Sequence, residues 1–127
     1  MSFEYKKFHE MEIWKEAFTL QKEVFDLTKA FPRSEEHGLI GQLNRSTNSV
    51  CANFAESHGR FYYADKVRVL YIARGEIEET QSHLMVAASR QYIPKEKSDQ
   101  IISNYESVKI KINRYISVLM EDKKFKE

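Results

Sequence analysis

Apolar side chains recur along this chain at spacings of three and four residues, the periodicity of helices with one apolar face. The first such stretch extends from about residue 10 to residue 30 and ends at Phe31-Pro32, because a residue before proline is pushed out of the α-helical region. The pattern predicts a helix with an apolar stripe made of Trp14, Phe18, Gln21, Phe25 and Thr28, flanked by Ala17 and Val24.

Three more helices are predicted in the same way. The second covers about residues 35–57, with Ser34 as its N-cap and Gly59 as a left-handed terminating residue. The third covers about 64–89 and the fourth about 94–123, where Pro94 suits a first helical position. The stripe of the third is Val67, Leu70, Tyr71, Ile77, Leu84 and Met85, together with Arg74, Glu78 and Gln81. The fourth carries an unbroken heptad seam of Ile101, Tyr105, Val108, Ile112, Tyr115 and Leu119.

The predicted connections are short, which favours antiparallel neighbours. A chain of 127 residues is long enough to bury one sizeable core, and four Gly and two Pro leave little room for the turns of a β-sandwich. We therefore expect an all-α protein, an antiparallel up-down-up-down four-helix bundle that forms a single domain over residues 1–127.

The second predicted helix is unusually polar and has three distinct faces when residues are placed about 100° apart. An apolar arc contains Leu39, Leu43, Thr47, Val50 and Phe54. A polar stripe beside it contains Gln42, Arg45, Ser49, Asn53 and Glu56. A third face of small residues, on which another backbone could come close, contains Gly41, Asn48, Ala52 and Ala55.

Two interpretations of the polar stripe remain open. In the first, the stripe joins Arg74 and Glu78 of the third helix in a network that fixes how the helices register. In the second, Asn53, Glu56 and Arg60 bind a ligand. We favour the structural network, because buried charge is costly without partners and this chain offers matching ones.

Composition narrows the class of protein. The formal net charge of +1 argues against a surface that is basic throughout, and the single Cys51 rules out an internal disulfide framework. No apolar run approaches the roughly 18 residues of a membrane span, and the N-terminus lacks the apolar core of a secretory signal. We expect a cytoplasmic protein with no membrane partner.

The sequence does not support an enzyme. Glu79 and His83 are four residues apart rather than the three of a di-iron bundle motif, and no second copy exists. Cys51 lies at the edge of the apolar arc, where a cysteine usually acts as a small hydrophobe, and no phosphate-binding glycine loop is present. We expect no catalytic residue, no metal, no cofactor and no small-molecule substrate.

Residues 57–74 carry a net positive charge, because this segment contains four cationic side chains and one carboxylate. The aromatic run Phe61-Tyr62-Tyr63 lies among these cations, and such a mixture can follow a phosphate backbone and stack on unpaired bases. The candidate nucleic-acid contacts are Arg60, Lys66 and Arg68. The alternative is a solvated turn whose aromatic residues fold back on the bundle or fill a subunit interface.

Several short motifs together resemble one family. They are Trp14-Lys15-x-Ala17, Phe31-Pro32, Gly38-Leu39, Gln42-Leu43, Arg45, Ser49, Asn53, Ala55-Glu56, Gly59-Arg60, and Ala73-Arg74-Gly75 with Glu79. Their order and spacing over nearly the whole chain are similar to those of the four-helix bundle proteins encoded in 23S rRNA intervening sequences.

The resemblance implies a protomer that assembles into a homopentameric ring and has no known catalytic activity. It also implies relatedness to the accessory proteins of diversity-generating retroelements, which associate with nucleic acid. The chain departs from the family pattern at Asn44, Ser57, Lys66 and Glu76. The loss of a basic residue at Asn44 and the gain of an acid at Glu76 weaken the nucleic-acid interpretation.

Three functional hypotheses follow. The first is an oligomeric, noncatalytic scaffold that associates with RNA or a ribonucleoprotein. The second is a purely structural or protein-interaction module in which Phe3, Phe8 and Tyr62 mediate self-assembly or partner docking, without nucleic acid. The third, a metal-dependent bundle enzyme, has the least support.

Overall fold

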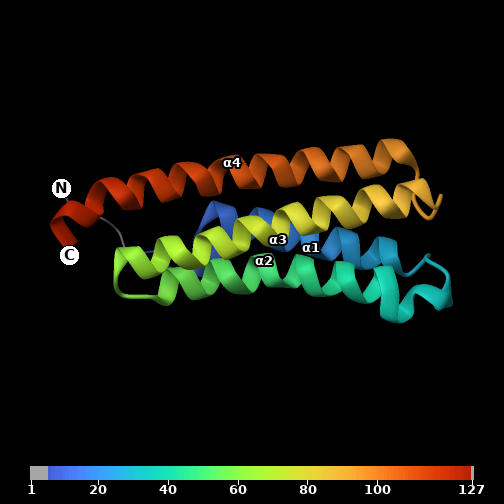
Figure 1. The fold of residues 1–127 in the computed structure, drawn as a ribbon, viewed down its shortest axis with the longest axis horizontal. Helices are drawn as coiled ribbons and strands as arrows, with labels where there is room; N and C mark the ends of the chain where they lie inside the picture. Colours follow the sequence, from blue (N-terminus) through green and yellow to red (C-terminus); the bar gives the residue numbers. More distant parts are fainter. Residues whose placement is uncertain (1–5, 127) are drawn as a thin grey trace.

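The structure is a computed structural model that describes the backbone of residues 6–126 and the side chains of residues 6–122. Phe3 therefore lies outside the described residues. Four long helices make up most of the chain: α1 (Glu12–Thr28), α2 (Gly41–Gly59), α3 (Tyr63–Ser89) and α4 (Lys95–Lys126). They lie side by side with successive helices antiparallel (Figure 1), and no strand occurs within residues 6–126. The all-α four-helix fold predicted from the sequence is confirmed.

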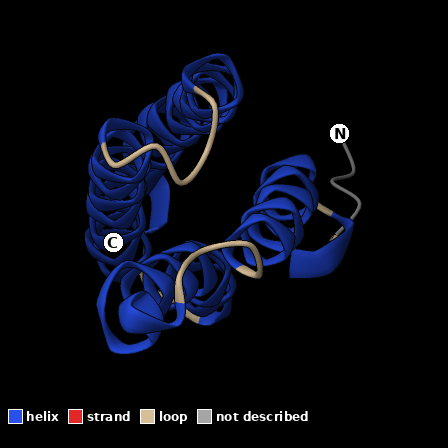
Figure 2. Cartoon of the chain, turned by 90° about the vertical axis from the view of Figure 1, so that its right-hand side faces the viewer, coloured by secondary structure: helices blue, strands red, loops and turns tan. Residues whose placement is uncertain are grey.

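Each helix packs against the next along the chain, and α4 also contacts α1. The α1–α2 and α3–α4 connections share one end of the bundle, which faces the viewer in Figure 2. The α2–α3 turn lies at the opposite end (Figure 1). This turn is short, because only residues 60–62 separate the two helices.

The predicted seam of α4 forms one wall of the core. Ile101, Tyr105, Val108 and Ile112 are completely buried, and Leu119 is buried as well. Tyr115 is only half-buried, and Ile116 takes its place in the core. The apolar arc predicted for α2 is buried at every one of its five positions.

The face that α1 buries includes Thr28 of the predicted stripe and its flanking residues Ala17 and Val24, but not the large aromatic rings. Its core residues are Ile13, Ala17, Leu20, Val24 and Thr28. Phe18 and Phe25 remain 43% exposed, and Trp14 is half-buried. Ile13, Ala17, Leu20 and Val24 repeat with the same spacing as the four residues Trp14, Phe18, Gln21 and Phe25, about 100° away on the helix. Periodicity alone therefore does not distinguish the two sets. On α3, similarly, Tyr71 and Met85 of the predicted stripe are exposed.

The chain enters α2 through two short helical turns, η2 (Arg33–Glu35) and the π-helical η3 (Glu36–Ile40), with non-helical dihedral angles at Gly38. The predicted cap at Ser34 is wrong, because the Glu35 carboxylate accepts the Leu39 backbone N–H at 3.1 Å. A Cβ at Gly38 would lie 2.5 Å from Glu35 Oε1, so a larger residue there would require the capping carboxylate to shift.

Gly59 also differs from its predicted role. No described glycine has a positive φ, and α2 continues through Gly59 to an extended Arg60. The left-handed residue is instead Gln91, with φ of 65°, in the α3–α4 connection.

Candidate functional site

The α2–α3 turn presents two aromatic rings to solvent. Phe61 is 69% exposed and Tyr62 is 56% exposed, and their rings meet edge to face with centroids 4.9 Å apart. The backbone on either side is held by hydrogen bonds from Arg60 N–H to the Ser57 carbonyl (3.3 Å) and from Lys66 N–H to the Tyr62 carbonyl (3.0 Å). The rings therefore project from an ordered turn at one end of the bundle.

The three predicted nucleic-acid contacts have different surroundings in this region. Arg60 forms an ion pair with Glu56 one helical turn earlier, and this pairing raises the pKa of the guanidinium. The Lys66 ammonium donates to the carbonyls of His58 at 2.8 Å and Ser57 at 3.4 Å, so it caps the C-terminal end of α2. Arg68 is exposed on the first turns of α3. Whether any of them contacts nucleic acid stays a prediction.

The N-terminal segment reaches the same end of the bundle. His58 Nε2 and the Lys6 carbonyl are 2.7 Å apart. Lys6 and Lys7 are both exposed, so this contact brings two more cations to the neighbourhood of the turn. The nearby carboxylates of Glu10 and Asp65 offset part of this charge.

The seven residues of the predicted polar network contact different parts of the molecule. On α2, Arg45 forms ion pairs with Glu76 (3.4 Å) and Glu79 of α3, whereas Glu56 pairs with Arg60 and Asn53 donates to the Ser49 carbonyl in its own helix. Gln42 is exposed. On α3, Arg74 donates to Asn113 of α4 at 2.8 Å, and Glu78 pairs with Lys109 of α4.

These contacts divide the predicted network between two helix seams. Arg45 and its two carboxylates join α2 to α3, while Arg74 and Glu78 join α3 to α4. Each of these cross-helix partners is a residue outside the predicted set. The contacts of Arg45, Arg74 and Glu78 are between helices, which accords with a structural role, whereas those of Asn53 and Glu56 are local to α2 and its end, so these contacts of the predicted set do not form one connected network.

His83 extends the Arg45 cluster. Its Nε2 lies 3.2 Å from Glu79 Oε2, and burial together with the Arg45 charge lowers the pKa of the imidazole. No group of three or more His, Cys, Asp or Glu side chains that could hold a metal ion occurs within the described residues. Burial raises the pKa of the Cys51 thiol to about 11, which keeps it protonated and a poor nucleophile near neutral pH.

Aromatic side chains lie along one exposed side of α1. The rings of Trp14 and Phe18 stack with centroids 4.9 Å apart, and the edge of Phe8 meets Trp14 at 5.4 Å. Two turns further on, Phe25 lies under the Lys29 ammonium at 4.9 Å. We call Trp14, Phe18 and Phe25 the aromatic stripe.

The aromatic stripe faces away from α4. The α1 side chains that pair with α4 are Glu16, with Lys111, and Glu23, with Lys97. Helical geometry places the stripe on the opposite flank of α1, toward α2. On α2, Ser46 faces α3 through its 2.7 Å hydrogen bond to Thr80. The exposed small residues of α2 lie on a different side of that helix, well away from Ser46. These are Gly41, Asn48 and Ala52, with Ala55 half-buried beside them.

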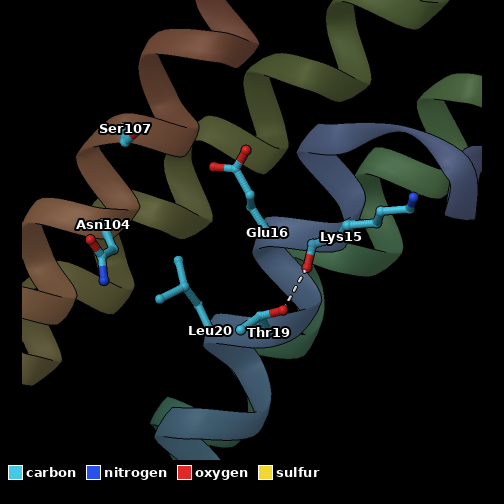
Figure 3. A pocket seen from close by; sticks show the side chains of 6 residues that line it. All are labelled: Lys15, Glu16, Thr19, Leu20, Asn104 and Ser107. Atoms are coloured by element: carbon cyan, nitrogen blue, oxygen red, sulfur yellow. Dashed lines mark hydrogen bonds between the residues drawn. The ribbon is translucent and has the colours of Figure 1, made fainter.

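The other flank of α1 forms a shallow groove with α4 (Figure 3). It has a volume of about 290 Å³ and is lined by Lys15, Glu16, Thr19, Leu20, Asn104 and Ser107. In Figure 3 Glu16 and Leu20 point toward α4, whereas Lys15 points away. The Lys111–Glu16 and Lys97–Glu23 ion pairs bracket the groove along the two helices, so it is a gap in an ion-paired seam.

Sequence reasoning missed the contacts of Glu35. Its carboxylate accepts hydrogen bonds from Arg90 Nη1 (2.7 Å) and the Tyr92 hydroxyl (2.9 Å), in addition to the cap of Leu39. These three donors hold the pKa of the Glu35 carboxyl below its ordinary value, with the Leu39 N–H as the largest cause. The only sequence signal was the position of Glu35 at a helix start, which does not show that the α3–α4 connection supplies two donors.

Comparisons with known proteins place the chain in a family. The family model described as 23S rRNA-intervening sequence protein matches residues 9–114. The chain is also similar to the crystal structure, at 1.70 Å resolution, of a protein with unknown function from the S23 ribosomal protein family of Bacteroides thetaiotaomicron VPI-5482. The two are 22% identical with a TM-score of 0.75, over 82% of this chain and 97% of that chain. At this identity the likeness shows the fold alone. No curated protein matches.

Proposed function

The chain belongs to the 23S rRNA-intervening sequence protein family, and we propose that it is a noncatalytic scaffold that assembles with copies of itself and associates with RNA or a ribonucleoprotein. We further propose five subunits, the number that the family resemblance implies. No described helix is long and apolar enough to cross a membrane. The observation that carries the assembly part is the exposed aromatic stripe of α1.

Aromatic side chains are among the residues enriched at the cores of protein interfaces. Phe18 and Phe25 keep 43% of their surface in solvent although the same helix buries residues as small as Ala17 and Thr28. Full burial of a phenylalanine contributes about 1.5–3 kcal/mol relative to exposure. Covering both rings in every subunit would therefore favour association.

The adjacent surface of α2 suits close contact. Gly41, Asn48 and Ala52 are exposed and lack the bulk that would hold another helix away. The phenylalanine rings of α1 protrude, whereas the small residues of α2 leave a shallow surface. The rings of one copy could therefore pack against the small residues of another. We propose that the aromatic stripe and this small-residue stripe form the subunit contact.

Native mass spectrometry tests the assembly. We expect the intact chain to give a pentamer, and the double variant Phe18→Ser/Phe25→Ser to give mainly the protomer with unchanged helix content. Met85→Ser is the matched control, because Met85 is 58% exposed but lies near the end of α3. A wild-type protomer across the micromolar range would contradict the proposal, as would a double variant that keeps the wild-type mass.

The RNA part of the proposal rests on the family and on the exposed cations around the α2–α3 turn, Lys6, Lys7 and Arg68. Repetition of this cluster in a symmetric assembly would multiply a modest local charge. Titration of a structured RNA against salt concentration tests it. We expect binding that weakens as salt rises, because released counterions contribute to affinity. A salt-independent response, or no binding tighter than about 10⁻⁴ M, would refute RNA association.

A further inference from the structure

We propose that the α2–α3 turn binds unpaired nucleotides of a single-stranded nucleic acid, with Phe61 and Tyr62 as the rings on which bases stack. This inference rests on the proposed association with RNA and names the form of nucleic acid and the site that takes it. The α2–α3 turn here means residues 60–62.

Both aromatic rings of the turn are exposed to solvent. Phe61, at 69%, is the most exposed large apolar side chain in the described part of the chain, and Tyr62 adjoins it at 56%. The two rings meet edge to face, and each of the two residues keeps more than half of its surface in solvent. Bases stack on such surfaces with little dependence on sequence.

Hydrogen bonds hold the turn in place before any ligand binds. The Lys66 ammonium ties α3 to the last carbonyls of α2, and His58 holds the Lys6 carbonyl at 2.7 Å. The N–H of Lys66 also fixes the Tyr62 carbonyl. A turn held in this way presents its rings without first having to be ordered, so the turn itself loses less conformational entropy on binding.

Exposed cations on both sides of the turn in the sequence supply positive charge. Arg68 lies in the second turn of α3 and Lys7 follows Lys6, whose carbonyl contacts His58; both cations are exposed and their charge would attract a phosphate backbone. The turn has few cations to offer, because Glu56 pairs with Arg60 and Lys66 caps α2. A duplex hides the faces of its bases and depends on phosphate contacts alone, whereas an unpaired strand also gains stacking. This balance favours the unpaired strand.

The experiment compares one RNA of about 12 nucleotides as a single strand and annealed to its complement, by fluorescence anisotropy at fixed salt. We expect the single strand to bind the wild type about tenfold more tightly than the duplex. Phe61→Ala/Tyr62→Ala should weaken single-strand binding by about tenfold to a hundredfold and leave duplex binding nearly unchanged.

Three control variants separate stacking from charge and from folding. Phe61→Tyr/Tyr62→Phe exchanges the two rings and should retain single-strand binding. Arg68→Gln should weaken binding to both forms and reduce the salt dependence by about one phosphate contact. Met85→Ala, an exposed apolar residue toward the other end of the bundle, should change neither.

The possible outcomes distinguish this inference from the proposed function. Equal, salt-dependent binding of both forms that survives the double alanine variant would overturn the turn as a stacking site while leaving RNA association intact. An absence of binding to either form would overturn both. A double alanine variant whose subunit number changes would identify the turn as a subunit contact and overturn the inference.

Discussion

The helices α1 and α4 each carry a regular apolar stripe, and the two stripes have opposite surroundings. Ile101, Tyr105 and Ile112 of α4 are completely buried. Phe18 and Phe25 of α1, with larger apolar side chains than isoleucine, stay 43% exposed. The α1 helix meets its neighbours instead through Ile13, Ala17, Leu20 and Val24, one residue earlier in the same repeat.

In the proposed function, this difference separates the residues that fold the chain from those that associate with a second copy. The α4 seam is covered by the other three helices, so its role is to stabilise the protomer. The aromatic stripe of α1 remains partly exposed to solvent in the folded chain, and an exposed apolar surface of that kind often marks an interaction site. The comparison predicts that changes in the two stripes affect different measurements.

The largest effect should come from the α4 seam. Ile112→Ala removes buried methyl groups and leaves a cavity, so we expect the free energy of unfolding to fall by about 2–5 kcal/mol. Phe25→Ala should lower the stability of the isolated protomer by much less, because its ring is already partly in solvent. Urea denaturation under conditions where both variants are protomers checks this. Equal losses would break the distinction between the two stripes.

A smaller effect of opposite sign should come from the same seam. The Tyr105 hydroxyl is fully buried and has no hydrogen-bond partner among the described residues, and burial, together with Cys51, raises the pKa of this phenol. Removing an unsatisfied buried hydroxyl relieves its desolvation cost, so Tyr105→Phe should stabilise the protein by about 1–2 kcal/mol. A destabilised Tyr105→Phe variant, measured by the same denaturation, would show that the hydroxyl has a bonding role.

The next effect concerns the connection that leads out of α1. Glu35 binds Arg90 and Tyr92, and its folded-state pKa is lowered, so its contribution to stability is present above about pH 4.5 and is lost as pH falls through the lowered value. Glu35→Gln should lower the melting temperature near pH 7 by roughly 5 °C. The gap between the two proteins should narrow as pH falls below about 4.5 and through the lowered pKa of Glu35. A gap that is constant with pH would show that charge is not the cause.

The smallest effect should come from the ion pairs between α1 and α4. Lys97 lies 2.6 Å from Glu23, and both side chains are about one-third exposed. Such pairs contribute about 0.2–1 kcal/mol and are screened by salt. Lys97→Gln should therefore cost at most about 1 kcal/mol at low salt, measured by thermal denaturation, and less at 1 M salt. A large loss that persists at high salt would show that this seam, rather than the core, holds α1 in place.

The sequence predicts the buried residues best in helices where only one face is apolar. The α4 seam and the apolar arc of α2 are buried almost as expected, because each helix has only one continuous apolar face. On α1 two stripes with identical spacing compete, and the large aromatic rings draw attention to the exposed one. Choosing between them needs the neighbouring helices.

The polar residues were predicted less well, because their partners lie on other helices. The position of Arg45 on α2 follows from periodicity, but its pairing with Glu76 and Glu79 depends on how α3 packs beside it. Lys66 is a clear cation in the sequence, yet only the geometry of the turn shows that its charge caps α2. Residue type and spacing identify such side chains but do not say which contacts they make.

Sedimentation velocity of the wild type and of Phe18→Ser/Phe25→Ser, over the same range of protein concentrations, tests the central claim most directly. We expect the wild type to sediment as an assembly that dissociates only on dilution, and the double variant to sediment as a folded protomer throughout. Identical sedimentation of the two proteins, whether as protomers or as assemblies, would contradict the assignment of the aromatic stripe to self-association.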